Sequence, residues 1–304
     1  PWPGESLTVS VARPETAPGE FLTLERGNLS VRQGGQYREA TLVLVFRAAK
    51  GARHAVKLPP GAEVTRLAVS GREALPTGGP DEVGFALPPG VTEVTVNFRE
   101  KLGLSSFTRT PVIDLGLPGA NLAVSLELPA DRWLLAVSGD TPLAPAVLYW
   151  GWLAAVAALG LGLSFLPDTP LSRLSWLLYA LGLSQATPGN ALLAAAWIAA
   201  LAWRRRHPIA QGAAAFNIVQ VLLVLLTLAG LEALYETLGT GLLGLPRMQV
   251  AGNGSTVAAL RWTFDRLAEA LPACTAVSLP MAAYRAVMLA WAVWLAWSLI
   301  KWLR

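Results

Sequence analysis

The sequence predicts two parts, an N-terminal antiparallel β-sandwich over residues 1–142 and a helical transmembrane bundle over residues 143–304. Short stretches of alternating apolar and polar residues, separated by Gly and Pro, fill the first part, and this pattern is typical of half-buried strands. Long stretches without any charge fill the second part, which is the pattern of membrane-spanning helices. Together these two patterns predict a β-rich region outside a membrane and a helical anchor within it.

The composition of the 304-residue chain agrees with a membrane protein. It is 53% hydrophobic and 14% charged, whereas a soluble domain is about 45–50% apolar and about 25% charged. These values argue against an ordinary cytosolic enzyme and against a disordered chain. A single cysteine and two histidines leave no internal disulfide and little material for a metal site or a catalytic triad. We therefore expect no cofactor or metal.

The clearest strands come from four stretches with period-2 alternation, residues 7–11, 40–46, 93–98 and 121–128. Each would bury one face and expose the other. Two Pro-Pro-Gly turns, which end at Gly61 and Gly90, come before predicted strands. We interpret them as a repeated turn within one sandwich rather than as a duplicated binding loop. On this interpretation residues 1–140 should fold without the rest of the chain.

Four apolar blocks follow. Residues 143–166 are uncharged and would extend about 36 Å as a helix, enough to cross a hydrocarbon core of about 30 Å. Residues 174–203 are also uncharged, but polar residues and a proline interrupt them near residues 185–190. This block is either two short spans or a re-entrant hairpin. With the blocks at residues 213–231 and 279–300, the sequence predicts about five spans, or three spans plus a re-entrant hairpin.

The segment between the last two blocks, residues 239–278, is polar and rich in glycine. Five of its apolar residues recur at helical spacing: Val257, Leu260, Phe264, Leu267 and Leu271. This spacing predicts an amphipathic helix near residues 256–271, which would lie on the bilayer or against the β-sandwich.

The distribution of charge predicts the orientation in the membrane. The N-terminal part has a net charge of −1 and the C-terminal part +5, which together give the total of +4. Residues 204–206 are three consecutive arginines between two apolar blocks, and such basic loops stay in the cytoplasm. The sequence thus predicts an inner-membrane protein of a bacterial envelope, with a periplasmic β-sandwich and a cytoplasmic C-terminus. The basic residues belong to membrane loops, so no nucleic-acid partner is expected.

Glu232, Glu236 and Arg285 are the ionisable residues expected near membrane depth, where charges are costly and often functional. Helix arithmetic places Arg285 at the depth of the two glutamates, so we expect a carboxylate within about 4 Å of its guanidinium. Such a pair would either lock two helices together or form a proton or anion relay. Asn217 and Gln220 would line a pore or hydrogen-bond to a neighbouring helix.

Aromatic residues mark both ends of the apolar blocks. Tyr149, Trp150 and Trp152 lie near the start of the first block and predict an interfacial belt. Four tryptophans crowd the last block: Trp291, Trp294, Trp297 and Trp302. They are typical of a lipid-facing surface with an inner belt, and the alternative is a quinone or lipid site.

Four segments carry a family resemblance: residues 109–116, 131–133, 216–221 and 248–255. They resemble the C-terminal region of large, uncharacterised bacterial membrane proteins of the proteobacterial type. The resemblance implies a β-rich periplasmic region joined to a helical anchor, and it assigns no functional residue. Because the chain starts at Pro1 without an export signal, we expect it to follow an earlier part of a longer protein.

Two functions fit these patterns. The first is a non-catalytic envelope protein whose β-sandwich binds a protein partner or a glycan, while its helices contact membrane lipids and anchor or assemble a complex. The second is a transporter or an intramembrane enzyme that uses Glu232, Glu236 and Arg285. No motif for nucleotide binding, a zinc peptidase or a serine hydrolase occurs, which favours the first. A water-filled cavity joining the three ionisable residues would favour the second.

Overall fold

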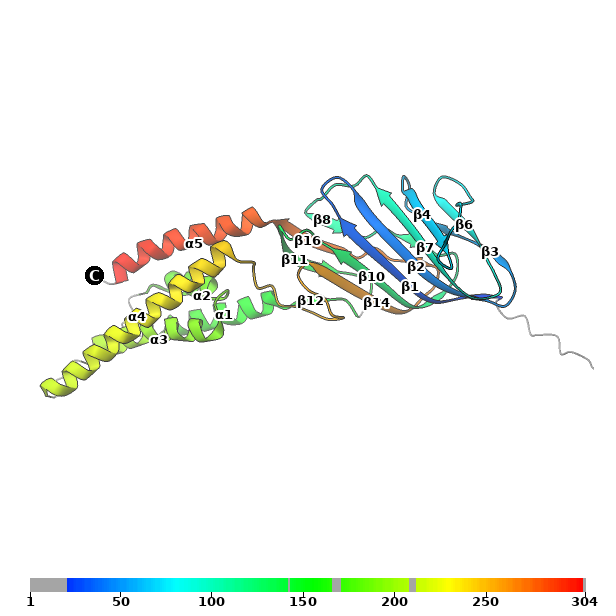
Figure 1. The fold of residues 1–304 in the computed structure, drawn as a ribbon. Helices are drawn as coiled ribbons and strands as arrows, with labels where there is room; N and C mark the ends of the chain where they lie inside the picture. Colours follow the sequence, from blue (N-terminus) through cyan, green and yellow to red (C-terminus); the bar gives the residue numbers. More distant parts are fainter. Residues whose placement is uncertain (1–20, 142, 166–170, 208–211, 303–304) are drawn as a thin grey trace, which may run out of the picture.

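The computed structural model describes residues 21–141, 143–165, 171–207 and 212–302. Within these residues, a β-rich region and a group of helices lie end to end (Figure 1). The predicted order, strands first and helices afterwards, is confirmed for the largest part of the chain. The predicted strand at residues 7–11 lies outside the described residues.

A large sheet forms the body of the β-rich region. In the part of the chain that the structure describes it has seven strands, and their spatial order is β14 (Ala259–Leu267), β10 (Gly119–Glu127), β1 (Leu22–Gln33), β2 (Arg38–Ala48), β7 (Gly90–Glu100), β4 (Glu63–Val69) and β5 (Arg72–Glu73). Burial alternates along β2, where Leu42, Leu44 and Phe46 are fully buried and the residues between them are not. The predicted strands at residues 40–46, 93–98 and 121–128 are thereby confirmed.

The pairing of β10 with β1 is parallel, which corrects the prediction of a wholly antiparallel sheet. Between β7 and β10 the chain leaves the large sheet and forms β8 (Phe107–Arg109) and β9 (Ile113–Asp114) in two smaller sheets. It then returns on the far side of β1 and runs in the same direction as that strand. The excursion supplies the long connection that a parallel pair requires.

Three smaller sheets complete the β-rich region as described. The first contains β15 (Ala270–Leu271), β9, β3 (Ala52–Lys57) and β6 (Glu82–Leu87); the second contains β11 (Arg132–Ser138), β16 (Thr275–Pro280) and β8; the third contains β12 (Ala146–Val147) and β13 (Val250–Ala251). Residues of the large and small sheets share one hydrophobic core. Within it, the rings of Phe46 on β2 and Phe85 on β6 lie 5.7 Å apart.

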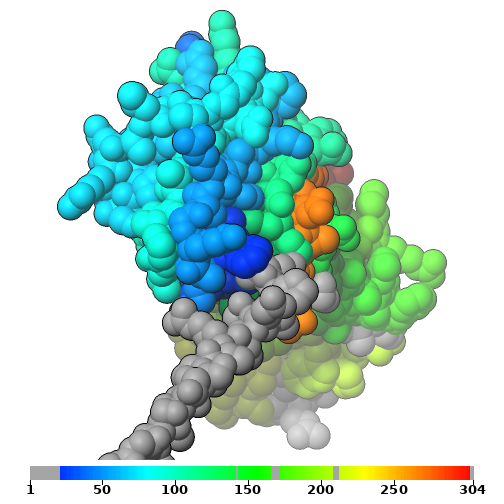
Figure 2. Space-filling view, turned by 90° about the vertical axis from the view of Figure 1, so that its right-hand side faces the viewer, coloured from blue at the N-terminus to red at the C-terminus, as the bar shows by residue number. Residues whose placement is uncertain are grey.

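The predicted amphipathic helix near residues 256–271 is wrong, because this segment forms β14 and β15. β14 pairs antiparallel with β10 along its length, and Figure 2 shows this late segment, in orange, beside earlier strands. Leu260, Trp262 and Phe264 are buried, whereas Arg261 and Asp265 are exposed. Burial therefore alternates with the two-residue period of a strand. Leu260 and Phe264 fit both the helical and the strand period. The segment forms a strand because the edge of β10 supplies backbone hydrogen-bond partners for it.

The β-rich region consequently consists of two separate segments of chain. β12 pairs with β13, so the two ends of the stretch that contains the first four helices lie side by side. Backbone hydrogen bonds continue this pairing between Leu148 and Gln249, at 3.1 Å, and between Tyr149 and Met248, at 3.2 Å. The first four helices are thus an insertion between two paired strands, and the last helix continues directly from β16.

The described residues form five helices: α1 (Tyr149–Leu163), α2 (Arg173–Leu183), α3 (Pro188–Arg206), α4 (Ala213–Leu243) and α5 (Met281–Trp302). By length and composition only α4 and α5 among them are long and apolar enough to cross a membrane, fewer than the five spans predicted. α1 and α2 have 15 and 11 residues, or about 22 and 16 Å. The prediction failed at the first block because its first residues form β12 and the helix begins only at Tyr149.

α3 packs antiparallel to α4 along the length of α3. Three contacts follow one another along the pair. Asn190 donates to Glu236 at 2.7 Å, the indole of Trp197 donates to Thr227 at 3.1 Å, and Arg204 lies over the ring of Phe216 at 5.6 Å. The polar break predicted near residues 185–190 separates α2 from α3, where the Thr187 side chain accepts a hydrogen bond from the backbone of Asn190 and caps α3.

Candidate functional site

The structure does not bring the predicted ionisable residues together. Among the described residues no ion pair joins Arg285 to Glu232 or Glu236, and all three side chains are exposed. The predicted pairing is therefore wrong. On α5 the neighbouring Tyr284 faces the helix core, and a step of one residue rotates the next side chain by about 100°, so Arg285 points outward.

Glu236 has a different partner from the one predicted. Its carboxylate accepts a hydrogen bond from Asn190 of α3, at 2.7 Å. The cavity beside it measures about 10 Å³, about the least that one water molecule requires. Asn217 is exposed and Gln220 half-buried, and neither side chain hydrogen-bonds to another described residue. Nineteen residues of helix, about 28 Å, separate Asn217 from Glu236, so the five predicted polar residues form no common site.

Aromatic side chains gather instead where the helices meet the β-rich region. We call this group the aromatic collar: Trp133 of β11, Tyr149, Trp150 and Trp152 of α1, and Tyr284 and Trp291 of α5. The rings of Trp133 and Tyr284 lie edge to face at 5.4 Å. The collar contains the three aromatic residues at the start of α1 for which the sequence predicts an interfacial belt.

Each indole N–H of the collar has a partner. Trp150 donates to the carbonyl of Leu135 at 2.6 Å, Trp152 to that of Ser184 at 3.1 Å and Trp291 to that of Leu178 at 2.9 Å. Trp133 donates to the sulfur of Met248 at 3.2 Å. These hydrogen bonds fix the orientation of the four indole rings.

A groove of about 460 Å³ lies among these residues, and we call it the junction groove. Its aromatic lining comes from β11, α1 and α5: Trp133, Tyr149, Trp150, Tyr284, Trp291 and Trp294. Aliphatic residues of α1, α2 and α5 complete the walls, and no described residue of the lining carries a charge. The volume falls within the range of about 300–1,000 Å³ that is usual for small-molecule sites.

Gly182 of α2 makes the shape of the groove possible. A Cβ atom added there would lie 1.8 Å from the ring of Trp291. Only glycine lets that indole rest on α2 and donate to the carbonyl of Leu178. The groove is therefore formed by close packing of α2 and α5, which belong to segments more than a hundred residues apart.

Two polar side chains of the lining have donors without a partner among the described residues. The amide oxygen of Gln185, which is 6% exposed, accepts from the backbone of Arg247 at 2.9 Å, and this leaves the amide nitrogen of Gln185 without a hydrogen bond to a described residue. The hydroxyl of Tyr284, which is 3% exposed, likewise has no partner among the residues described. Neither donor atom is sealed from solvent, so each is open to an acceptor in the groove.

Tyr149, unlike Tyr284, has a hydrogen-bond partner for its hydroxyl group. The hydroxyl of Ser184 donates to the carbonyl of Leu181 at 2.6 Å, so the hydroxyl of Tyr149 must be the donor in its contact with Ser184, at 3.1 Å. Its hydrogen-bonding capacity is thus used within the protein. The groove therefore presents apolar walls and two donors, from Tyr284 and Gln185.

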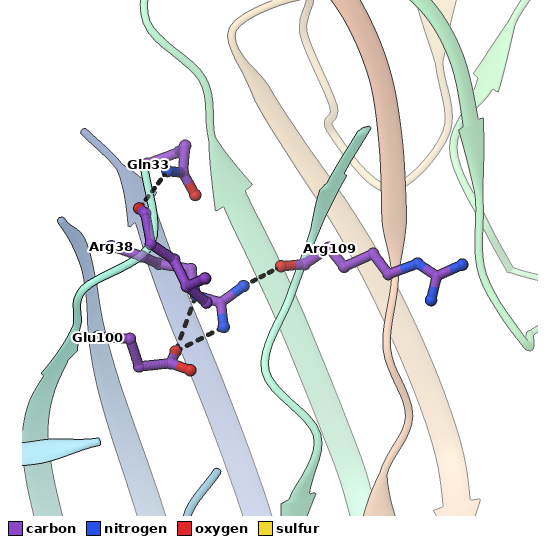
Figure 3. A network of polar contacts seen from close by, with 5 residues as sticks. Gln33, Arg38, Glu100 and Arg109 are labelled. Carbon is purple, nitrogen blue, oxygen red and sulfur yellow. Dashed lines mark hydrogen bonds and ion pairs between the residues drawn. The ribbon is translucent and has the colours of Figure 1, made fainter. Parts of the chain in front are cut away.

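A second buried polar group lies at one end of the large sheet, as Figure 3 shows. Arg38 and Glu100 form an ion pair with side chains 8% and 6% exposed and an N–O distance of 2.6 Å. Arg38 also donates to the carbonyl of Arg109, and Gln33 donates to the carbonyl of Leu102 at 3.1 Å. This network holds the segment between β7 and β8 against the large sheet.

A polar hollow of about 620 Å³ lies at the end of the β-rich region that faces away from the helices, near β3, β4 and β6 (Figure 1). Arg53, Glu82 and Thr77 contribute polar groups to it, and the side chain of Leu75 is 89% exposed beside it. His54 also lines the hollow, but its Nε2–H donates to the carbonyl of Leu115 at 2.7 Å.

The comparisons with known proteins show little. Neither a protein-family model nor a curated protein matches the chain. Similar solved structures include an M1 zinc metallopeptidase from Deinococcus radiodurans, at 14% identity and a TM-score of 0.30, and a two-domain M1 zinc metallopeptidase bound to L-tryptophan, at 12% identity and a TM-score of 0.30. The match covers 41% of this chain and 36% and 37% of those chains, so it spans about a third of their length.

A likeness at this level carries no argument about the fold or activity of the present chain. Within the described residues, no group of three or more His, Cys, Asp or Glu side chains is placed to hold a metal ion.

The sequence contains only a partial signal for the junction groove. The crowded tryptophans of the last block predict a lipid-facing surface or, as the alternative, a quinone or lipid site, and Trp291 and Trp294 do line the groove. Gln185 and Tyr284 could not be singled out, because their role depends on contacts among β11, α1, α2 and α5. The sequence feature that could have indicated the groove is the recurrence of Trp and Tyr at residues 133, 149–152 and 284–294.

Proposed function

We propose that this protein is a non-catalytic integral protein of the bacterial inner membrane. Its helices hold the β-rich region at the periplasmic surface, where that region binds a protein partner or a glycan. The observation that carries the proposal is an exposed apolar flank on α4 and α5 that ends in interface-type residues on both sides.

The apolar flank is extensive. On α4 it includes Ile218, Val221, Leu222, Leu225 and Leu228, all more than half exposed, and on α5 Val287, Leu289, Val293 and Ile300, also more than half exposed. Exposed apolar residues in such number are unfavourable in water and support a contact with a membrane or a protein. The apolar stretch Met281–Lys301 of α5 has 21 residues, or about 31 Å, which matches a hydrocarbon core of about 30 Å.

Basic residues are more numerous at one end of the flank than at the collar end, where Arg285 is exposed. The aromatic collar borders the end next to the β-rich region. At the other end are residues 204–206, all arginines, and Lys301, whose ammonium group lies 5.2 Å over the ring of Trp297. Basic residues concentrate on the cytoplasmic side, which supports a periplasmic position for the β-rich region.

The connectivity supports three crossings. α4 runs toward the β-rich region and α5 runs away from it (Figure 1). The chain must therefore reach the far end before α4 begins, and α3, antiparallel to α4 along its length, carries it there. In this proposal α1 and α2 form a short hairpin in the outer half of the membrane. This arrangement differs from the predicted alternative, in which residues 143–166 cross the membrane and residues 174–203 form the hairpin.

The polar hollow supports a binding role for the β-rich region. It lies at the end farthest from the helices and combines charged, hydroxyl and exposed apolar groups. This combination suits a protein segment or a sugar. By contrast, the transporter or intramembrane enzyme would need Glu232, Glu236 and Arg285 to act together, and the structure separates Arg285 from both glutamates.

Cysteine labelling of intact cells tests the topology. The native Cys274 is buried, and burial raises the pKa of its thiol to about 12, so it should give little background. A membrane-impermeant maleimide should label Ser70→Cys, on an exposed turn of the β-rich region, and should label Arg205→Cys only after permeabilisation. The reverse pattern would overturn the orientation, and recovery of the protein in the soluble fraction would overturn the anchoring.

A further inference from the structure

We propose that the junction groove binds the ester region and the upper acyl chain of a bilayer phospholipid. This inference goes beyond anchoring, because it assigns a specific lipid site. It rests on the proposed function, since the groove must lie in a membrane for a lipid to reach it.

Two donors without protein partners are available to a ligand in the groove. The hydroxyl of Tyr284 and the amide nitrogen of Gln185 are both on residues more than nine-tenths buried, and both residues line the groove. Neither donor atom is itself sealed from solvent. An acceptor that enters the groove can therefore complete the hydrogen bonds of both groups.

The chemistry of the lining limits what that acceptor is. Two neutral donors suit a carbonyl oxygen. A phosphate or carboxylate would need a cationic side chain, and no described residue of the lining provides one. The remaining walls are aromatic and aliphatic, which suits a hydrocarbon chain. The ligand therefore carries a neutral carbonyl group at one end and a hydrocarbon chain beyond it.

The position of the groove favours a lipid from the surrounding bilayer as the source. Trp150 and Val287, which line the groove, are 44% and 58% exposed. The groove thus opens beside the apolar flank of α5 and is not enclosed. Tyr284 lies three residues, about 4.5 Å, from the start of α5, within the aromatic collar. Aromatic belts mark the headgroup boundary, and the ester groups of phospholipids lie next to it.

The test uses the full chain in nanodiscs doped with a phospholipid whose acyl chain carries a diazirine next to the ester. After illumination, peptide mass spectrometry should place the adducts on α1 and α5 around the groove. Tyr284→Phe removes only the hydroxyl and should lower this labelling about fivefold, the loss expected for one neutral hydrogen bond. The matched control is Tyr235→Phe, the same change at a residue that is 79% exposed and lies outside the groove.

A second pair of variants does not depend on the hydroxyl. Ala290→Phe fills the groove and should abolish the adduct, whereas Ala296→Phe, on an exposed part of α5 outside the groove lining, should leave it unchanged. Excess unlabelled phospholipid should compete with the probe. Decylubiquinone tests the other carbonyl-bearing amphiphile.

Competition by decylubiquinone but not by phospholipid would overturn the proposal in favour of a quinone. Labelling spread evenly over the exposed faces of α4 and α5, unaffected by Tyr284→Phe and Ala290→Phe, would show ordinary boundary lipid and also overturn it. The anchoring is judged separately, by flotation of the protein with membranes. A protein that floats but shows no groove adduct refutes the lipid site alone.

Discussion

Tyr284 and Arg285 are consecutive residues with opposite surroundings. The tyrosine is buried between helices and lines the junction groove, whereas the arginine points away from both glutamates of α4. Depth along a helix can be computed from residue numbers, and this calculation placed Arg285 level with Glu232 and Glu236. The direction of a side chain around the helix depends on which neighbours the helix packs against. Here Arg285 points away from the two glutamates, so the ion pair does not form.

Arg38 and Glu100 show what a paired buried charge does in the same molecule. Glu100→Gln leaves the guanidinium of Arg38 buried without a counter-charge and should lower the free energy of unfolding by about 3–5 kcal/mol. The double variant Arg38→Met, Glu100→Leu should recover most of this loss. Chemical denaturation followed by tryptophan fluorescence measures both.

The matched control for that prediction is Glu127→Gln, which breaks the pair with Arg32. The side chains of that pair are 71% and 44% exposed, and it should contribute no more than about 1 kcal/mol. Equal losses at the two sites would contradict the importance of burial.

His54 makes the free energy of unfolding of the β-rich region depend on pH. Burial lowers the pKa of its imidazole below the ordinary 6.5. The unfolded chain therefore takes up the proton first as the pH falls. The stabilisation is fully present above pH 6.5 and is lost as the pH falls through 6.5 toward the folded-state pKa. His54→Gln should reduce the difference between the free energies of unfolding at pH 7.5 and pH 5.5. The same difference in both proteins would refute the assignment.

At the scale of elements, the contact between α2 and α5 depends on one glycine. Gly182→Ala would place a Cβ atom 1.8 Å from the Trp291 ring and should destabilise the helices by about 1–3 kcal/mol. Thermal unfolding in detergent measures this change. Gly162→Ala on α1 is the control, because no atom lies within 4 Å of its added Cβ. There the substitution should be neutral or stabilise by up to about 1 kcal/mol. Loss of stability at both positions would indicate a general intolerance of alanine and not this contact.

The sequence of β14 fits both the period of a helix and the period of a strand. The apolar residues in and around it match helical spacing over fifteen residues, 257–271, and strand spacing over five, 260–264. The helix would have needed only a membrane surface, whereas the strand needed a free sheet edge. β10 supplies that edge, more than 130 residues earlier in the chain, and a pattern search within one segment does not detect such a partner.

The whole molecule is a β-rich region with a helical insertion, and this arrangement changes which fragment should fold. The sequence predicts that residues 1–140 fold alone. The structure predicts that they do not, because they lack Leu260, Trp262 and Cys274 of the core and expose the edge of β10. Residues 1–147 joined to residues 250–280 by an Asn-Gly turn should instead give a β-type circular dichroism spectrum and a cooperative melt. A cooperative melt of residues 1–140 alone would refute this prediction.

The sequence alone determined the order of the two parts, the strands β2, β7 and β10, the break between α2 and α3 and the basic end of the helices. These features depend on local composition and periodicity, which follow directly from the need to bury one face of each element. Only the tertiary structure decided that residues 259–280 complete the sheets, that Arg285 has no carboxylate partner among the described residues and that Gln185 and Tyr284 share a groove. Each of these features depends on which distant segment packs against the residue or strand concerned. Those contacts are set by the packing of the whole chain and not by the local sequence.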